Sequence, residues 1–80
     1  MPPLLFSLDP SGPLPLYEQL YRALAGRIRA GELPAGCRLP GKRSLAEQLG
    51  VSVNTVDTAY QMLAAEGWLD ARPRSGFFVA

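Results

Sequence analysis

Residues 39–66 decide the fold: they read L-P-G-K-R-S-L-A-E-Q-L-G-V-S-V-N-T-V-D-T-A-Y-Q-M-L-A-A-E. This stretch predicts two short helices joined by a tight Gly-Val-Ser turn. Gly50 ends the first helix, because a helix C-terminus favours a residue that tolerates a positive φ angle. Ser52 is a good N-cap for the second helix. The pattern is typical of a helix-turn-helix, although an ordinary helical hairpin in a globular core shares the same local turn.

Two candidate N-caps precede the first of these helices. Ser44 and Glu47 have the spacing of a capping box, which would begin the helix at Ser44. Gly41 is an acceptable but weaker N-cap and would begin the helix three residues earlier. The sequence leaves both starts open.

The second helix, predicted over residues 53–66, has two different faces at 100° per residue. Its apolar side chains fall within one arc and predict the core face: Val53, Val56, Ala59, Tyr60, Leu63 and Ala64. The opposite face carries Asn54, Thr58, Gln61 and Ala65, flanked by Thr55 and Asp57. Small polar side chains at the N-terminal end of a helix suit base edges and phosphates, and the helix dipole is positive there. This face therefore predicts contact with the major groove of DNA.

The chain before this stretch predicts a leader and one more helix. Residues 1–13 hold four of the eight prolines and predict an extended leader, because proline lacks an amide donor and restricts its predecessor. A helix with an apolar stripe for the core is expected from Pro15, as its first residue, to about Ala30. Gly26 costs this helix roughly 1 kcal/mol against alanine, so we expect close packing against it.

The chain after this stretch predicts a β-hairpin. Residues 68–72 and 76–79 have the composition of two short strands, with Pro73-Arg74-Ser75 at the tip. Residues 37–39 are long enough only for a minimal strand. A helix-turn-helix followed directly by a hairpin with a basic tip is a winged helix-turn-helix. We therefore predict one mainly α domain over residues 14–80, with three helices and a two- to three-stranded wing.

Composition limits the function of this domain. The 80 residues are 48% apolar and carry a formal net charge of +1, less basic than many nucleic-acid binders. The sequence has no histidine, one cysteine, no paired carboxylates at useful spacing and no Gly-rich phosphate loop. We therefore expect neither an enzyme nor a metal or cofactor site in this chain. It also lacks a signal peptide and an apolar run of membrane-spanning length, which favours the cytoplasm.

A resemblance to the N-terminal domain of GntR-type bacterial transcription regulators is carried by three segments: G-E-L-P-A-G-C-R-L-P-G-K-R-S-L-A-E-Q-L-G-V-S-V-N-T-V, A-Y-Q-M-L-A-A-E-G-W-L and S-G-F-F-V-A. It spans residues 14–80 and implies a sequence-specific domain for double-stranded DNA. The segment P-L-Y-E-Q-L-Y-R-A-L and the Ala59-Tyr60 pair look most like the MocR branch, with the YtrA branch second.

The resemblance also implies that this chain is a fragment. Members of the MocR branch continue into a large aminotransferase-like domain that binds pyridoxal phosphate, whereas those of the YtrA branch have a short helical extension. Dimerisation and ligand sensing would then lie in a C-terminal domain absent from these 80 residues. We expect a homodimer in the full-length protein and a reader of one half-site in this chain.

The resemblance and the placement of the cations together predict the DNA contacts. Arg43 matches a near-universal arginine of the family and is expected to reach a phosphate or a guanine edge, whereas Arg38 and Lys42 are expected to anchor phosphates. In the major groove we expect Ser52, Asn54, Thr55 and Thr58, with Asn54 pairing bidentately with adenine. The wing, residues 72–76, is expected to approach the backbone or minor groove through Arg72, Arg74, Ser75 and Gly76.

Simpler roles remain open for three of these residues. Lys42 could be a solvated surface charge, Ser52 could serve only as a helix cap, and Gly76 could be only a turn residue with positive φ.

Three departures from the family pattern bear on mechanism, and two of them, at Val53 and Phe77, together with Asp57 and the near-neutral charge favour a second function, a winged helix used for protein–protein contact. The family usually has arginine where Val53 stands and often serine where Gly41 stands. The recognition helix therefore lacks a cation and bears Asp57, which repels phosphate but could accept a hydrogen bond from cytosine. Phe77 replaces a usual threonine, and strand alternation would place it opposite Phe78, toward solvent, as a docking spot.

Overall fold

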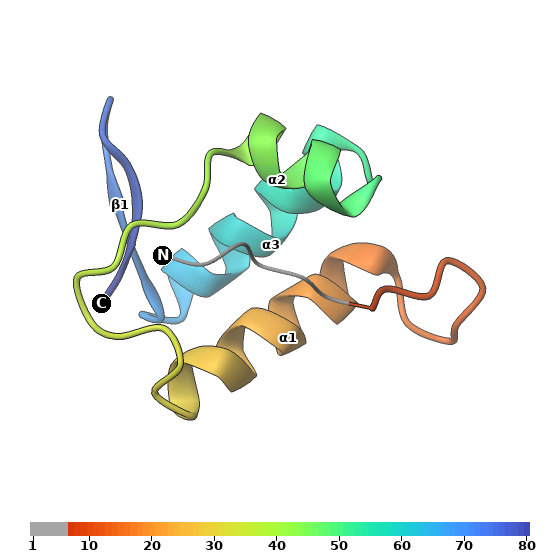
Figure 1. The fold of residues 1–80 in the computed structure, drawn as a ribbon, viewed down its shortest axis with the longest axis horizontal. Coiled ribbons are helices and arrows are strands. Elements are labelled where there is room, and N and C mark those ends of the chain that lie inside the picture. Colours follow the sequence, from red (N-terminus) through yellow and green to blue (C-terminus); the bar gives the residue numbers. More distant parts are fainter. Residues whose placement is uncertain (1–6) are drawn as a thin grey trace.

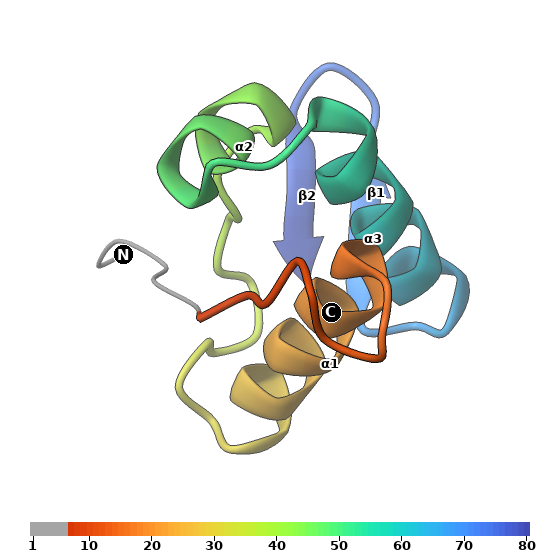
Figure 2. The ribbon, with the colours of Figure 1, turned by 90° about the vertical axis from the view of Figure 1, so that its right-hand side faces the viewer.

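The computed structural model describes residues 7–80 as three helices and a two-stranded antiparallel sheet (Figure 1). In chain order these are α1 (Leu16–Arg29), α2 (Lys42–Leu49), α3 (Val53–Ala65), β1 (Leu69–Arg72) and β2 (Gly76–Val79). This arrangement confirms the predicted winged helix-turn-helix. α1 lies at one end of the molecule, whereas α2, the start of α3 and the hairpin tip lie at the other (Figure 2).

The core forms where α1 crosses α3. Leu20 and Leu24 of α1, and Val56 and Leu63 of α3, have no exposed surface. Tyr60 of α3 is equally buried, and its hydroxyl donates a hydrogen bond of 2.7 Å to the carbonyl oxygen of residue 40. Burial raises the pKa of this phenol, so the donor stays protonated. The bond ties the middle of α3 to the segment that leads into α2.

The turn between α2 and α3 follows the sequence prediction, and α2 begins at the earlier of the two predicted starts. Gly41 is the N-cap, and its carbonyl accepts a hydrogen bond of 3.0 Å from the Leu45 amide. Ser44 lies inside the first turn, so no capping box forms there; the earlier start gains this extra backbone hydrogen bond. Gly50 ends α2 at φ 68°, a left-handed conformation that favours glycine. Ser52 caps α3 as predicted.

The hairpin gains a third, minimal strand. β1 and β2 pair with Leu69 opposite Val79 and Arg72 opposite Gly76. On the other side of β2, residues 37–39 form a single bridge, in which the Leu39 amide donates to the carbonyl of residue 77 at 2.8 Å. The minimal strand predicted for residues 37–39 is therefore confirmed, and it places the segment that leads into α2 beside the wing.

Phe77 faces the core, so the prediction that it faces solvent is wrong. Its ring centroid lies 5.0 Å from that of Tyr60, on the same side of β2 as the buried Val79. Side chains two residues apart lie on the same face of a strand. Because Val79 is buried, Phe77 also lies on the face of β2 that packs on the core. Phe78 is the outward aromatic residue, and the Arg72 guanidinium lies 4.2 Å from its ring centroid.

The predicted extended leader is also corrected where the structure describes it. Residues 1–6 lie outside the described residues. Asp9–Gly12 forms a turn in which the Gly12 amide donates to the Asp9 carbonyl at 3.0 Å. The Gln19 side chain of α1 bonds both backbone groups of Asp9 at 2.8 Å. Aspartate, serine and glycine favour turns, and Pro10 stands at the second position of this turn, where the fixed φ of proline fits. Pro15 is the N-cap of α1, one position before its first residue.

Gly26 is exposed on α1, and nothing lies within 4 Å of a Cβ added there, so the predicted close packing is wrong. Gly26→Ala is expected to raise the free energy of unfolding by about 0.5–1 kcal/mol, because alanine loses less backbone entropy in a helix. Thermal unfolding followed by circular dichroism should show a midpoint roughly 2–8 °C higher. A lower midpoint would mean that α1 needs glycine at this position for a reason outside its own packing.

Candidate nucleic-acid interface

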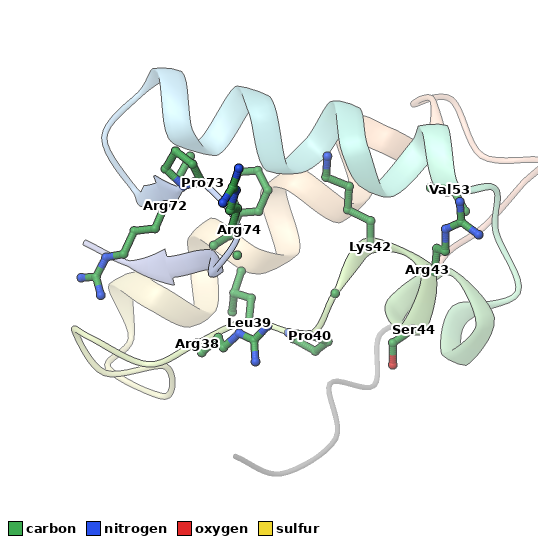
Figure 3. Close-up of a pocket in the computed structure, with 14 residues that line it drawn as sticks. Arg38, Leu39, Pro40, Lys42, Arg43, Ser44, Val53, Arg72, Pro73 and Arg74 are labelled. Carbon is green, nitrogen blue, oxygen red and sulfur yellow. The ribbon is translucent and has the colours of Figure 1, made fainter.

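A hollow of about 660 Å³ lies between the start of α2 and the hairpin (Figure 3). Five cations border it: Arg38, Lys42, Arg43, Arg72 and Arg74. Between them the lining is apolar, from Leu39, Pro40, Val53, Ala71, Pro73 and Phe77. The fold thus gathers the cations predicted to contact DNA around one concave surface. The start of α2 and the hairpin tip lie at the same end of the molecule as the start of α3 (Figure 2).

Arg38 lies across the wing at Gly76. Gly76 has a φ of +113°, and a Cβ added there would lie 3.2 Å from Nε of Arg38. Gly76 therefore has the positive φ considered from the sequence, whereas its predicted close approach to DNA stays a prediction. The group that approaches it in the structure is the Arg38 guanidinium.

Arg43 and Arg74 are exposed, and neither forms an ion pair or a side-chain hydrogen bond within residues 7–80. Arg43 lies in the first turn of α2 and extends beside Val53 (Figure 3). Arg74 occupies the hairpin tip at φ 65°, next to the exposed Ser75, whose amide donates to the carbonyl of residue 72 at 3.0 Å. Both guanidinium groups are open to an anion that approaches this end of the domain.

Lys42 has an internal partner that the sequence did not indicate. Its ammonium lies 2.5 Å from Oδ1 of Asp57 in α3 and 5.5 Å from the ring centroid of Phe77. The hydrogen bond from Lys42 is the main cause that holds the pKa of the Asp57 carboxyl below its ordinary value. Asp57 is therefore ionised at neutral pH, and the two charges balance. Neither the predicted phosphate anchor nor the alternative, a solvated charge, included this contact.

Arg72 is directed away from the other four cations (Figure 3). Its Nε lies 3.4 Å from a carboxylate oxygen of Asp70, and its guanidinium covers Phe78 on the outer face of the hairpin. The structure therefore groups Arg38, Arg43 and Arg74 as cations without a carboxylate partner in its described part, and sets Lys42 and Arg72 apart as paired cations.

The four side chains predicted to enter the major groove form two pairs with different local contacts. Ser52 and Thr55 bond each other: the Ser52 hydroxyl accepts from the Thr55 amide at 3.1 Å, and the two hydroxyls lie 2.9 Å apart. Asn54 and Thr58 are exposed one turn apart, with no side-chain partner among residues 7–80. Val53, beside them, is 42% exposed at the edge of the hollow. The side chains free to contact bases at this end are thus Asn54 and Thr58.

Known proteins match this chain over most of its length. Residues 16–79 match the family described as "Bacterial regulatory proteins, gntR family". The chain belongs to the GntR family. A relative named "Probable rhizopine catabolism regulatory protein MocR", from Rhizobium meliloti, is 51% identical over 73 residues. That match covers 91% of this chain and 15% of the relative, and it supports a MocR-like GntR domain.

Solved structures agree with this assignment. YtrA from Sulfolobus acidocaldarius, a GntR-family transcription factor, matches with a TM-score of 0.86 and 36% identity, over 91% of this chain and 77% of that one. AraR(DBD) in complex with operator ORX1 matches with a TM-score of 0.79 and 31% identity, over 95% and 93% of the two chains. The GntR chain described here is accordingly a DNA-binding domain of the winged helix-turn-helix type.

Two features of this GntR domain were missed by the sequence analysis. The apolar lining of the hollow combines single residues from segments far apart in the chain, and no local pattern marks them. The Lys42–Asp57 pair joins residues of two helices. The sequence identifies Asp57 as an acidic residue of the recognition helix, but Lys42 comes close to it only because α2 packs against α3.

The described residues do not fit a pyridoxal phosphate or metal site. Lys42 is the only lysine of the sequence, and it is paired with Asp57 at the surface. Within residues 7–80, no three histidine, cysteine or carboxylate side chains stand together to hold a metal ion. None of the helices in that part of the chain is long and apolar enough to cross a membrane.

Proposed function

We propose that this GntR domain binds double-stranded DNA sequence-specifically in the bacterial cytoplasm, as the reader of one half of a two-fold operator. α3 would lie in the major groove and the wing on the adjacent backbone or minor groove. The observation that carries the proposal is the grouping of Arg38, Arg43 and Arg74 around one hollow, next to the exposed polar face of α3.

The two groups of side chains suit the two kinds of DNA contact. Guanidinium groups without internal partners are available to phosphates, whose neutralisation supplies most of the sequence-independent affinity. Asn54 and Thr58 are available to base edges, which carry the sequence information. AraR(DBD), which this domain resembles in fold, forms a complex with an operator, and this supports operator DNA as the partner of this domain.

Fluorescence anisotropy tests this proposal with labelled duplexes from the DNA upstream of the protein's own coding region. Titrations at several salt concentrations, each with a scrambled duplex as competitor, separate specific from general binding. We expect saturable binding that falls steeply with salt and resists the competitor. Because a single domain reads only one half-site and can bind weakly, the same titration is repeated with two copies of the domain joined as a dimer. If the dimer also fails to bind, the DNA-binding proposal is refuted.

The alternative function, protein–protein contact through the wing, has lost its main support. It depended on an exposed Phe77, which instead packs against Tyr60. What remains is the net charge of +1, the valine at position 53 where the family usually has arginine, and the acidic Asp57, which is itself paired with a cation.

Asn54→Ala is expected to relax the preference for one base pair and to leave the salt dependence unchanged, because Asn54 reads a base and carries no charge. Selection from a randomised duplex library, with sequencing of the bound fraction, measures the preference at each position. Thr58→Ala is the matched variant one turn further along α3 and should act at a different position. An unaltered preference profile would show that Asn54 is not a base reader.

Dimerisation and ligand binding are proposed for a part of the protein outside these 80 residues. The chain spans 15% of the length of the MocR relative, which leaves room there for other domains. A homodimer would place two copies of α3 in successive major grooves. Pyridoxal phosphate, if the full protein binds it, would be held by residues outside this chain.

A further inference from the structure

An ion pair joins the two helices of the helix-turn-helix at the DNA-facing end of the domain. The Lys42 ammonium of α2 lies 2.5 Å from the Asp57 carboxylate of α3. The two side chains are 35% and 41% exposed, although Oδ1 of Asp57, the oxygen that faces Lys42, is itself buried. Solvent-exposed ion pairs contribute little to stability. The main consequence of this one is for the charge that Lys42 presents to its surroundings.

Lys42 borders the same hollow as Arg38, Arg43 and Arg74, yet its charge is balanced. Figure 3 shows its side chain extending toward α3, whereas Arg43 extends outward beside Val53. The Phe77 ring, 5.5 Å from the ammonium, adds a second internal contact. Of the five cations that border the hollow, three therefore have no carboxylate partner within residues 7–80, and two, Lys42 and Arg72, are paired.

We propose that Asp57 limits the affinity of this domain for DNA by competing with phosphate for Lys42. The inference rests on the proposed DNA-binding function. Each cation that contacts a phosphate releases counterions from the DNA. The logarithm of the binding constant falls linearly with the logarithm of the salt concentration, and each such contact steepens this slope, the salt exponent, by about 0.9. While Asp57 holds Lys42, one such contact is lost. Asp57 thereby lowers the sequence-independent part of the binding and leaves more of the discrimination to the exposed side chains of α3.

Asp57→Asn tests this directly, because it removes the competing charge and keeps the shape of the side chain. We expect binding at 50 mM salt to become roughly threefold or more tighter, and the salt exponent to rise by about 0.9. The gain should be the same on upstream and scrambled duplexes, since phosphates are common to both. Glu32→Gln, in the loop after α1, removes one negative charge at the opposite end and should leave the exponent unchanged.

Lys42→Met completes a double-mutant cycle. In the Asp57→Asn background it should abolish the gain, whereas in the wild-type background it also leaves the Asp57 carboxylate without its cation, so binding should weaken there. This cycle distinguishes a released Lys42 from a general effect of net charge. A gain that survives in the double variant would overturn the proposal, because the tighter binding would then not come from Lys42.

Three further results would overturn the proposal. Unchanged affinity in Asp57→Asn would show that the pair does not compete with phosphate. Weaker binding with an altered base preference would make Asp57 a reader of cytosine. Weaker binding with a lower unfolding midpoint would make the pair a support for α3. In each case the wild-type domain still binds DNA, whereas failure of the proposed function would appear as no binding by the wild-type domain at all.

Discussion

Leu24→Ala is expected to lower the free energy of unfolding by about 2–5 kcal/mol, because it leaves a cavity where α1 crosses α3. Leu24 has no exposed surface and belongs to the single cluster of buried side chains that both helices share. A domain of 80 residues buries a modest core, so a loss of this size is a large part of its total stability.

Urea denaturation followed by circular dichroism would measure this loss, and a thermal scan should show a midpoint lower by roughly 8 °C or more. Gly26→Ala, two residues along the same helix, is the matched control and is expected to change stability in the opposite direction. If Leu24→Ala unfolds within the error of the wild-type domain, α1 does not close the core and the packing of α1 on α3 is wrong.

Local chemistry allowed the turn and the helix ends to be predicted from the sequence. Gly50 and Ser52 act through the backbone of their own turn, and both roles were confirmed. The start of α2 was not decided in the same way, because Gly41 and Ser44 are both acceptable caps. The choice depended on a backbone hydrogen bond that no residue type reveals.

Orientation across the sheet was the weakest part of the prediction. Phe77 and Phe78 are chemically alike, so alternation along one strand says that they face opposite sides without saying which side is the core. The packing of Phe77 against the buried ring of Tyr60 shows which of the two phenylalanines faces the core. The same limit applies to the cations. Five were singled out from the sequence, but only the tertiary structure shows that Lys42 and Arg72 have carboxylate partners.

Arg43→Ala is expected to weaken DNA binding by about 1–3 kcal/mol, a factor of roughly 5 to 150, while the domain stays folded. Arg43 is exposed at the start of α2 and makes no ion pair or side-chain hydrogen bond in the described part of the chain. Its removal therefore leaves no buried group without a partner and should not change the unfolding midpoint. All of the expected loss concerns a contact formed with DNA.

The salt dependence of binding separates the two contacts that Arg43 could make. A phosphate anchor would lower the affinity for every duplex and reduce the salt exponent by about 0.9, whereas a contact to guanine would also relax the preference at one base pair. Arg22→Ala is the matched control: it removes an exposed cation of α1, paired with Glu18 at 2.9 Å, and should leave DNA binding nearly unchanged. Equal losses in both variants would mean that net charge alone governs binding. Because Arg43 and Lys42 are neighbours in the same turn, an Arg43→Ala loss of the same size in the wild-type and Asp57→Asn backgrounds would also show that Asp57 acts on Lys42 and not on Arg43.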